Sequence, residues 1–87
     1  MKALIKKYVK ERNEMLKKCN VNELRKFVNE HKQLYSSDFL ERFSKASDEV
    51  AEVTLHKMIV NVPNLPQGLR ERSALWLGMH GFSLEIC

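Results

Sequence analysis

Residues 38–60 form the one long stretch of this chain with a clear helical pattern. At 100° per residue, its apolar side chains fall in one narrow sector and a charged face lies opposite. The apolar set is Phe39, Phe43, Ala46, Val50 and Val53, and the charged set is Glu41, Arg42, Lys45, Asp48, Glu49, Glu52 and His56. The pattern predicts a central helix with a core side and a water side, against which the rest of the chain packs.

The start and the continuity of this helix depend on its serines. Ser37 or Asp38 is expected to cap its first turn. Ser44 and Ser47 are also suitable caps, so the stretch can instead be two shorter helices that meet near Ala46. Because the apolar phase continues through Ala46 without a shift, one continuous helix is the favoured interpretation.

Two helices are expected before the central one. Residues 2–18 combine an apolar face with lysine-rich outer faces. Asn20 is a good N-cap, and Glu23 three residues later completes a capping box, so the second helix is expected at 21–34. The connection between the two is short, and they should run antiparallel or at a sharp angle.

After the central helix, residues 61–68 hold both prolines and form the clearest linker. A strand over 53–62 is a competing interpretation because of its β-branched residues, but a single strand would have nothing to pair with. The last helix is expected at 68–80, with Gly81 as the left-handed residue that follows it. An apolar tail, 82–87, ends the sequence.

The 87 residues leave room for a single domain, 1–87, with one core. The expected fold is all-α, a compact bundle of about four helices at 2–18, 21–34, 38–60 and 68–80. With two cysteines and no CxxC spacing, the chain is expected in a reducing, cytoplasmic setting. No signal-peptide pattern follows Met1, and no apolar run approaches the roughly 20 residues that cross a bilayer, so no membrane partner is expected.

The sequence shows no pattern typical of catalysis, cofactor binding or metal binding. It has neither a GxSxG elbow nor a glycine-rich phosphate loop. Cys19 is expected on the apolar face of the first helix as a structural thiol, and Cys87 as an incidental terminal one. His31 and His80 lie on apolar faces, where packing is the usual role. The best acidic cluster, on the water side of the central helix, is expected to be solvated: Asp48, Glu49, Glu52 and His56.

Charge makes nucleic-acid binding the alternative function. The formal net charge is +4 and the sequence pI is about 9.2, and residues 2–18 alone carry +5. Lysines without interleaved aromatic or arginine-rich structure attract a phosphate backbone at most and do not read bases. The candidate residues of such an accessory nucleic-acid-binding protein are Lys6, Lys7, Lys10, Lys17 and Lys18.

Residues 69–86 resemble the first helix and turn of the helix-turn-helix in transposase-like proteins, in which Ser83 would cap the next helix. The same stretch is also similar to one helix of a HEAT-type repeat. The recognition helix that reads the major groove is missing from the first likeness, and one repeat alone cannot form a solenoid. Each likeness covers fewer than twenty residues, so no family is assigned.

The last helix offers more apolar surface than one neighbour can cover. Exposed apolar surface of this kind marks sites where proteins associate. The favoured hypothesis is a non-enzymatic module for protein–protein interaction or self-association, with a homodimer as one form. Its expected contact residues are Leu75, Trp76, Met79 and Phe82.

Overall fold

The computed structural model describes residues 2–85, and in that range every regular element is helical. The elements are α1 (Lys2–Lys18), α2 (Val21–Glu30), the short 3₁₀ helix η1 (Lys32–Leu34), α3 (Ser37–Lys45), α4 (Asp48–Val60) and α5 (Gln67–Met79). The all-α class is confirmed, but the expected count of about four is too low, since residues 2–85 form five α-helices. None of the described helices has the length and apolar character needed to cross a membrane.

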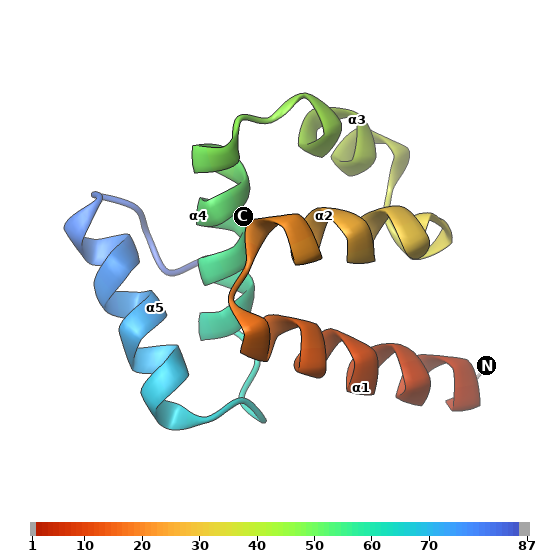
Figure 1. Cartoon of the computed structure of the whole chain (residues 1–87), viewed down its shortest axis with the longest axis horizontal. Helices are drawn as coiled ribbons and strands as arrows, with labels where there is room; N and C mark the ends of the chain where they lie inside the picture. Colours follow the sequence, from red (N-terminus) through yellow and green to blue (C-terminus); the bar gives the residue numbers. More distant parts are fainter. Residues whose placement is uncertain (1, 86–87) are drawn as a thin grey trace.

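Helix α4 is the element that the others share. Figure 1 shows α1 and α2 as an antiparallel pair whose joined ends meet α4, with α5 running alongside α4 in the opposite direction. Three residues of α4 are almost completely buried: Ala51, Leu55 and Ile59. The core around them comprises Met15, Leu16, Leu24, Phe27, Val28, Phe43, Val62, Leu65 and Leu69. The second half of the predicted central helix is therefore the centre of the core.

The predicted continuous helix over 38–60 is wrong, because the backbone leaves the helical conformation at Ala46 (φ −69°, ψ 143°). Ser47 then caps α4, and its hydroxyl accepts a hydrogen bond from the N–H of Val50 at 3.3 Å. The two acidic residues that open α4 lie where the helix dipole favours negative charge. Of the two interpretations of this stretch, the pair of helices meeting near Ala46 is the correct one.

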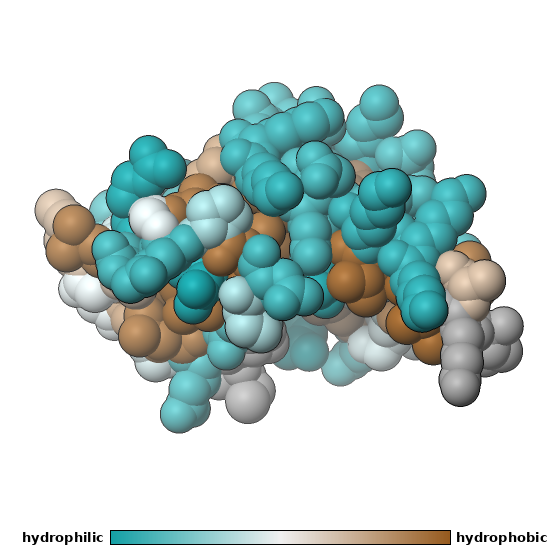
Figure 2. Space-filling model, turned by 90° about the horizontal axis from the view of Figure 1, so that it is seen from below, coloured by the Kyte–Doolittle hydropathy of each residue, from teal (hydrophilic) through white to brown (hydrophobic). Residues whose placement is uncertain are grey.

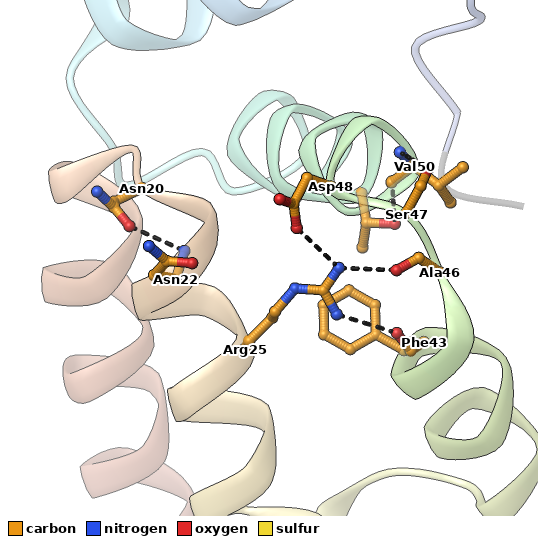
Figure 3. Close-up of polar contacts among 9 residues, drawn as sticks. Asn20, Asn22, Arg25, Phe43, Ala46, Ser47, Asp48 and Val50 are labelled. Atoms are coloured by element: carbon orange, nitrogen blue, oxygen red, sulfur yellow. Dashed lines mark hydrogen bonds and ion pairs between the residues drawn. The ribbon is translucent and has the colours of Figure 1, made fainter.

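Arg25 of α2 holds the bend between α3 and α4 (Figure 3). Its guanidinium donates hydrogen bonds to the carbonyl oxygens of Phe43 at 3.4 Å and Ala46 at 2.8 Å, and it contacts the Asp48 carboxylate at 3.2 Å. The guanidinium carbon also lies 5.4 Å from the centre of the Phe43 ring. A helix end leaves carbonyl oxygens without helical donors. The fork of N–H groups on one arginine supplies those donors here.

The bend changes which residues reach the core. Phe43 is buried as predicted, with 7% of its surface exposed, but Val50 is 53% exposed. Phe39 and Val53 are half-buried. The helical phase predicted one shared face, but the extended residue Ala46 lets α3 and α4 turn independently about their own axes. The predicted core position of Val50 is therefore wrong.

Helix ends follow the predicted caps in part. Asn20 caps α2 as expected, accepting hydrogen bonds from the N–H groups of Asn22 at 2.8 Å and Glu23 at 3.2 Å. The cap of α3 is Ser36, one residue before the expected pair. Helix α5 lies within one residue of its predicted bounds. Gly81 has the predicted left-handed conformation (φ 78°), which lets the N–H of Phe82 reach back to close the helix end.

The second helix is shorter than the predicted 21–34, because α2 ends at Glu30 and η1 follows. His31 leaves the helical conformation (φ −122°, ψ 34°), and its ring Nδ1 lies 2.8 Å from the carbonyl oxygen of Phe27. The ring Nε2 lies 3.2 Å from the Glu11 carboxylate of α1. This side chain thus ends α2 and ties it to α1, which is the packing role expected of His31.

Cys19 lies outside α1, and its predicted place on the apolar helix face is wrong. Its φ of 50° makes it the only non-glycine residue with positive φ among the described residues, and its side chain is exposed. The two-residue connection between α1 and α2 forces this conformation, since the chain must reverse before Asn20. The expected tail residue Cys87 lies outside the described residues.

Replacing Arg25 should loosen the α3–α4 bend. Arg25→Gln is expected to lower the free energy of unfolding by about 1–2 kcal/mol, because two carbonyl oxygens lose a charged donor. Arg25→Lys should recover less than half of this loss, since a single ammonium group cannot reach both oxygens. Urea unfolding measures both. Arg42→Gln is the matched control: its ion pair with Asp38 is exposed, and a change within about 0.5 kcal/mol is expected. Equal losses in both glutamine variants would contradict this role for Arg25.

Replacing Cys19 with glycine should stabilise the protein. Glycine adopts positive φ without the steric cost that a Cβ atom carries, so Cys19→Gly is expected to raise the free energy of unfolding by about 0.5–1 kcal/mol. Cys19→Ala keeps the Cβ atom and removes only the thiol, so it should leave stability nearly unchanged. Thermal unfolding of the two variants compares them directly. A stabilisation of the same size in both would show that the backbone conformation is not the cause.

Candidate interaction surface on the last helix

Helix α5 presents opposite faces to the core and to solvent. Leu69, Ser73 and Leu77 are buried, one turn apart along the face toward α4. On the outer side, Leu75 is 64% exposed and Met79 is 76% exposed. These two residues are four positions apart and so lie next to each other on the helix surface. The structure therefore brings together two of the four predicted contact residues as an exposed apolar pair.

The segment after α5 exposes two further apolar side chains. Phe82 is 38% exposed and Leu84 is 46% exposed. Two hydrogen bonds hold the segment against the body: the Phe82 N–H donates to the Leu77 carbonyl at 2.9 Å, and the Asn61 side-chain amide donates to the Leu84 carbonyl at 2.9 Å. Figure 2 shows hydrophobic residues at the left of the molecule, where α5 lies, and others along the middle and at the right. We call Leu75, Met79, Phe82 and Leu84 the α5 surface.

Trp76, the fourth predicted contact residue, has a different position. Its ring stacks against His56 of α4, with centroids 4.4 Å apart, and against His80, with centroids 4.0 Å apart. The His80 ring is held by its Nδ1, which lies 2.8 Å from the Trp76 carbonyl oxygen. Trp76 is half-buried. Its ring joins α5 to α4 and is not one of the outward side chains of the α5 surface.

His56 is buried, so its predicted place on the water side is wrong. Only 7% of its surface is exposed, and its Nδ1 lies 2.9 Å from the hydroxyl oxygen of Ser73. Burial lowers the pKa of His56, and the nearby Glu52 carboxylate opposes that shift in part. Asp48 and Glu49 are exposed as predicted. The pattern on α4 alone misplaced His56 because α5 covers this part of the charged face.

His56 lies between the Glu52 carboxylate and the Ser73 hydroxyl, as the histidine of a catalytic triad lies between its acid and its nucleophile. The distances and the burial fit a structural role in packing α5 against α4. The Glu52 carboxylate lies 3.6 Å from His56 Nε2, beyond a good hydrogen bond. Ser73 is 1% exposed, whereas a nucleophile must meet its substrate. One sequence signal could have revealed the pair: Ser73 shares the apolar face of α5 with leucines, and a hydroxyl buried there needs a hydrogen-bonding partner.

The lysines of α1 are interleaved with carboxylates. Salt bridges join Lys7 to Glu11, Lys17 to Glu14 and Lys18 to Glu23, at 3.3–4.0 Å. Lys6 and Lys10 are exposed. A surface cavity of about 510 Å³ between α1 and α2 has a lining of mixed charge: Lys7, Lys10, Lys18, Lys26, Glu11, Glu14, Glu23 and Glu30. The predicted basic residues therefore do not form one continuous positive surface.

Two further expectations concern α4 and the end of the chain. In residues 2–85, no group of three or more His, Cys, Asp or Glu side chains is arranged to hold a metal ion. The described residues after α5 form turns and bends, and no helix begins at Ser83 before residue 85.

Comparison of the chain with models of protein families, with curated proteins and with solved structures found no match. Function must therefore be inferred from the residues of this chain alone.

The burial of His56 should make stability depend on pH. In the unfolded chain the imidazole takes up a proton as the pH falls through about 6.5, whereas the folded protein resists protonation at this site. The unfolded state then binds more protons, so the free energy of unfolding falls from about pH 6.5 down to the lowered folded pKa. Urea unfolding at about pH 7.5 and about pH 5.5 measures this loss.

His56→Gln supplies the control for this measurement, since glutamine offers a hydrogen bond to Ser73 and does not titrate. The variant should lose less stability between the two pH values than the wild-type protein. The groups around His56 remain in the variant: Glu52, Ser73, Trp76 and His80, with Lys17, Cys19 and Arg72 lining the same cavity. An equal loss in both proteins would assign the pH dependence to other groups.

Proposed function

We propose that this chain is a small non-enzymatic module that self-associates through the α5 surface. The observation that carries the proposal is the exposure of Leu75 and Met79, at 64% and 76%, side by side on one helix. A single exposed leucine is ordinary in a folded protein. Together with the exposed Phe82 and Leu84, this pair is the kind of apolar surface that marks an interface.

The chemistry of the surface favours an apolar protein partner. Burying apolar area yields about 25 cal/mol per Å², and the outward side chains of Leu75 and Met79 have no cover within the described residues. Arg72 and Glu71 are exposed on the same helix, one turn nearer its start. An apolar centre with charged residues at its margin is the usual anatomy of an interface between proteins.

Gly78 favours a second copy of the chain as that partner. A glycine inside a helix costs about 1 kcal/mol relative to alanine, yet a methyl group added at Gly78 would meet nothing within 4 Å beyond its chain neighbours and the backbone of its own helix. Packing inside the molecule therefore does not require glycine here, whereas close approach of another helix would. Two α5 helices related by a two-fold axis present the same apolar residues to each other, which makes the surface self-complementary.

Charge introduced on the α5 surface should dissociate the assembly. In Leu75→Glu/Met79→Glu, four carboxylates would meet at the two-fold contact, so we expect dissociation to a monomer, at least about tenfold weaker in Kd. Light scattering after size-exclusion chromatography, over a range of protein concentrations, measures the mass. Leu4→Glu is the matched control, because Leu4 is 49% exposed on α1 and lies outside the α5 surface; its mass should equal that of the wild-type protein.

Gly78→Ala separates association from folding. It should stabilise α5 by about 0.5–1 kcal/mol and weaken self-association, a combination that a purely structural role would not give. A wild-type protein that stays monomeric at all concentrations would overturn the proposal. The same experiment repeated with duplex and single-stranded nucleic acid at low salt tests the alternative through Lys6 and Lys10. A complex that weakens steeply with salt would favour that function instead.

A further inference from the structure

A second uncovered apolar surface lies at the bend between α3 and α4. It is a groove with a volume of about 370 Å³. Its lining comes from the end of η1, from α3 and from α4: Tyr35, Phe39, Val50, Val53, Thr54, Lys57 and Met58. We call it the elbow groove. It is separate from the α5 surface, with which it shares no residue.

The fold produces this groove because α4 is apolar on more sides than its neighbours cover. Ala51, Leu55 and Ile59 belong to the buried core, and His56 packs on α5. The remaining stripe carries Val50 and Val53 at its upper end, with Lys57 and Met58 two turns further on. The bend at Ala46 turns α3 across this stripe, so that Phe39 forms one wall and Tyr35 another.

Phe39 is held firmly as a wall of the groove. Its ring stacks on Tyr35, with centroids 5.3 Å apart, and on Phe43, with centroids 5.4 Å apart. Phe43 in turn lies against the Arg25 guanidinium. These contacts continue from the bend to the groove, so the wall is set by the same interactions that set the angle of α3. A pre-formed apolar wall lowers the entropy cost of binding a ligand.

Among the polar groups of the groove, the hydroxyls are hydrogen-bonded and one charged side chain, Lys57, has no salt-bridge partner among the described residues. The Tyr35 hydroxyl is hydrogen-bonded to the Tyr8 hydroxyl at 2.7 Å, and the Thr54 hydroxyl donates to the Val50 carbonyl at 3.2 Å. Burial raises the pKa of Tyr35, so its phenol stays neutral beside an anion. Lys57 is the only charged lining residue, and it forms no salt bridge with a carboxylate of the described residues.

We propose that the elbow groove binds a small apolar acid, with its aliphatic chain between Phe39 and the valines of α4 and its carboxylate at Lys57. A groove of this volume lies in the range of small-molecule sites. An apolar wall combined with one charged group is an arrangement by which such sites orient a ligand. The positive charge of Lys57 selects an anionic end group over a neutral or cationic one.

Octanoate and 1-octanol test this assignment, because they share a chain length and differ in end group. Each is titrated into the methyl-labelled full chain, and binding is followed by the methyl resonances. Octanoate should shift the methyl groups of Val50, Val53 and Met58 and bind more tightly than 1-octanol. Octylammonium, with the opposite charge, should bind most weakly of the three.

Substitutions test which residues contact the carboxylate of the ligand and which contact its aliphatic chain. Lys57→Gln should weaken octanoate by up to about fivefold, the range of a partly exposed ion pair, and leave 1-octanol unchanged. Val50→Glu, at a position already 53% exposed, places a carboxylate in the groove and should weaken octanoate by at least about tenfold. Leu75→Glu, on the α5 surface, should leave octanoate binding unchanged.

Three results would overturn the assignment. One is equal binding of octanoate and 1-octanol, because the charge of Lys57 would then play no part. Another is a set of methyl shifts outside the groove, because the ligand would then bind elsewhere. The third is a change of mass in light scattering for Val50→Glu, which would show that a second copy covers the groove. Because Leu75→Glu/Met79→Glu tests the α5 surface alone, failure of self-association there and failure of octanoate binding here are separate outcomes.

Discussion

The contact of Arg25 with the end of α3 decides the shape of this molecule. One side chain from α2 donates to the carbonyl oxygens of Phe43 and Ala46 and meets the carboxylate that opens α4. A straight helix over the same residues would keep those carbonyls for its own N–H groups and would carry α3 away from α2. The bend returns α3 to the body of the protein, where Phe43 joins the core. The elbow groove follows from the packing that results, because the helices packed around α4 leave one of its apolar sides uncovered.

The two surfaces differ in ways that suit different partners. The α5 surface is convex and made of outward side chains, with Met79 the most exposed of the large hydrophobic residues that the structure describes. The elbow groove is concave, walled by stacked rings and bordered by a lysine. A convex apolar helix suits another helix, and a small concave site suits a small ligand. The interleaved charges of α1, by contrast, offer no continuous surface of one sign.

Local signals in the sequence predicted the elements well, and long-range contacts account for what they missed. Asn20, Pro66 and Gly81 act within one turn of a helix, so α1, the start of α2 and α5 fall close to their predicted positions. Leu75 and Met79 were predicted because their phase on α5 opposes that of the buried leucines. The break at Ala46 is held by a hydrogen bond from Arg25, twenty-one residues earlier, and the buried His56 ring is paired with Ser73, seventeen residues later. Periodicity along one helix carries no information about such partners.

The tryptophan and the two tyrosines lie in different parts of the molecule, so their spectroscopic signals report on different contacts. The single tryptophan lies between α4 and α5, stacked on two imidazoles, whereas both tyrosines, Tyr8 and Tyr35, share one hydrogen bond on the side of α1 and η1. Indole emission thus follows the loss of contact between the last two helices, and phenol absorbance follows the separation of the first helix from the rest. Coincidence of the two signals during unfolding would mean that so small a chain melts as one cooperative unit. Different transitions in the two signals would mean that the α4–α5 contact and the packing of α1 are lost separately during unfolding.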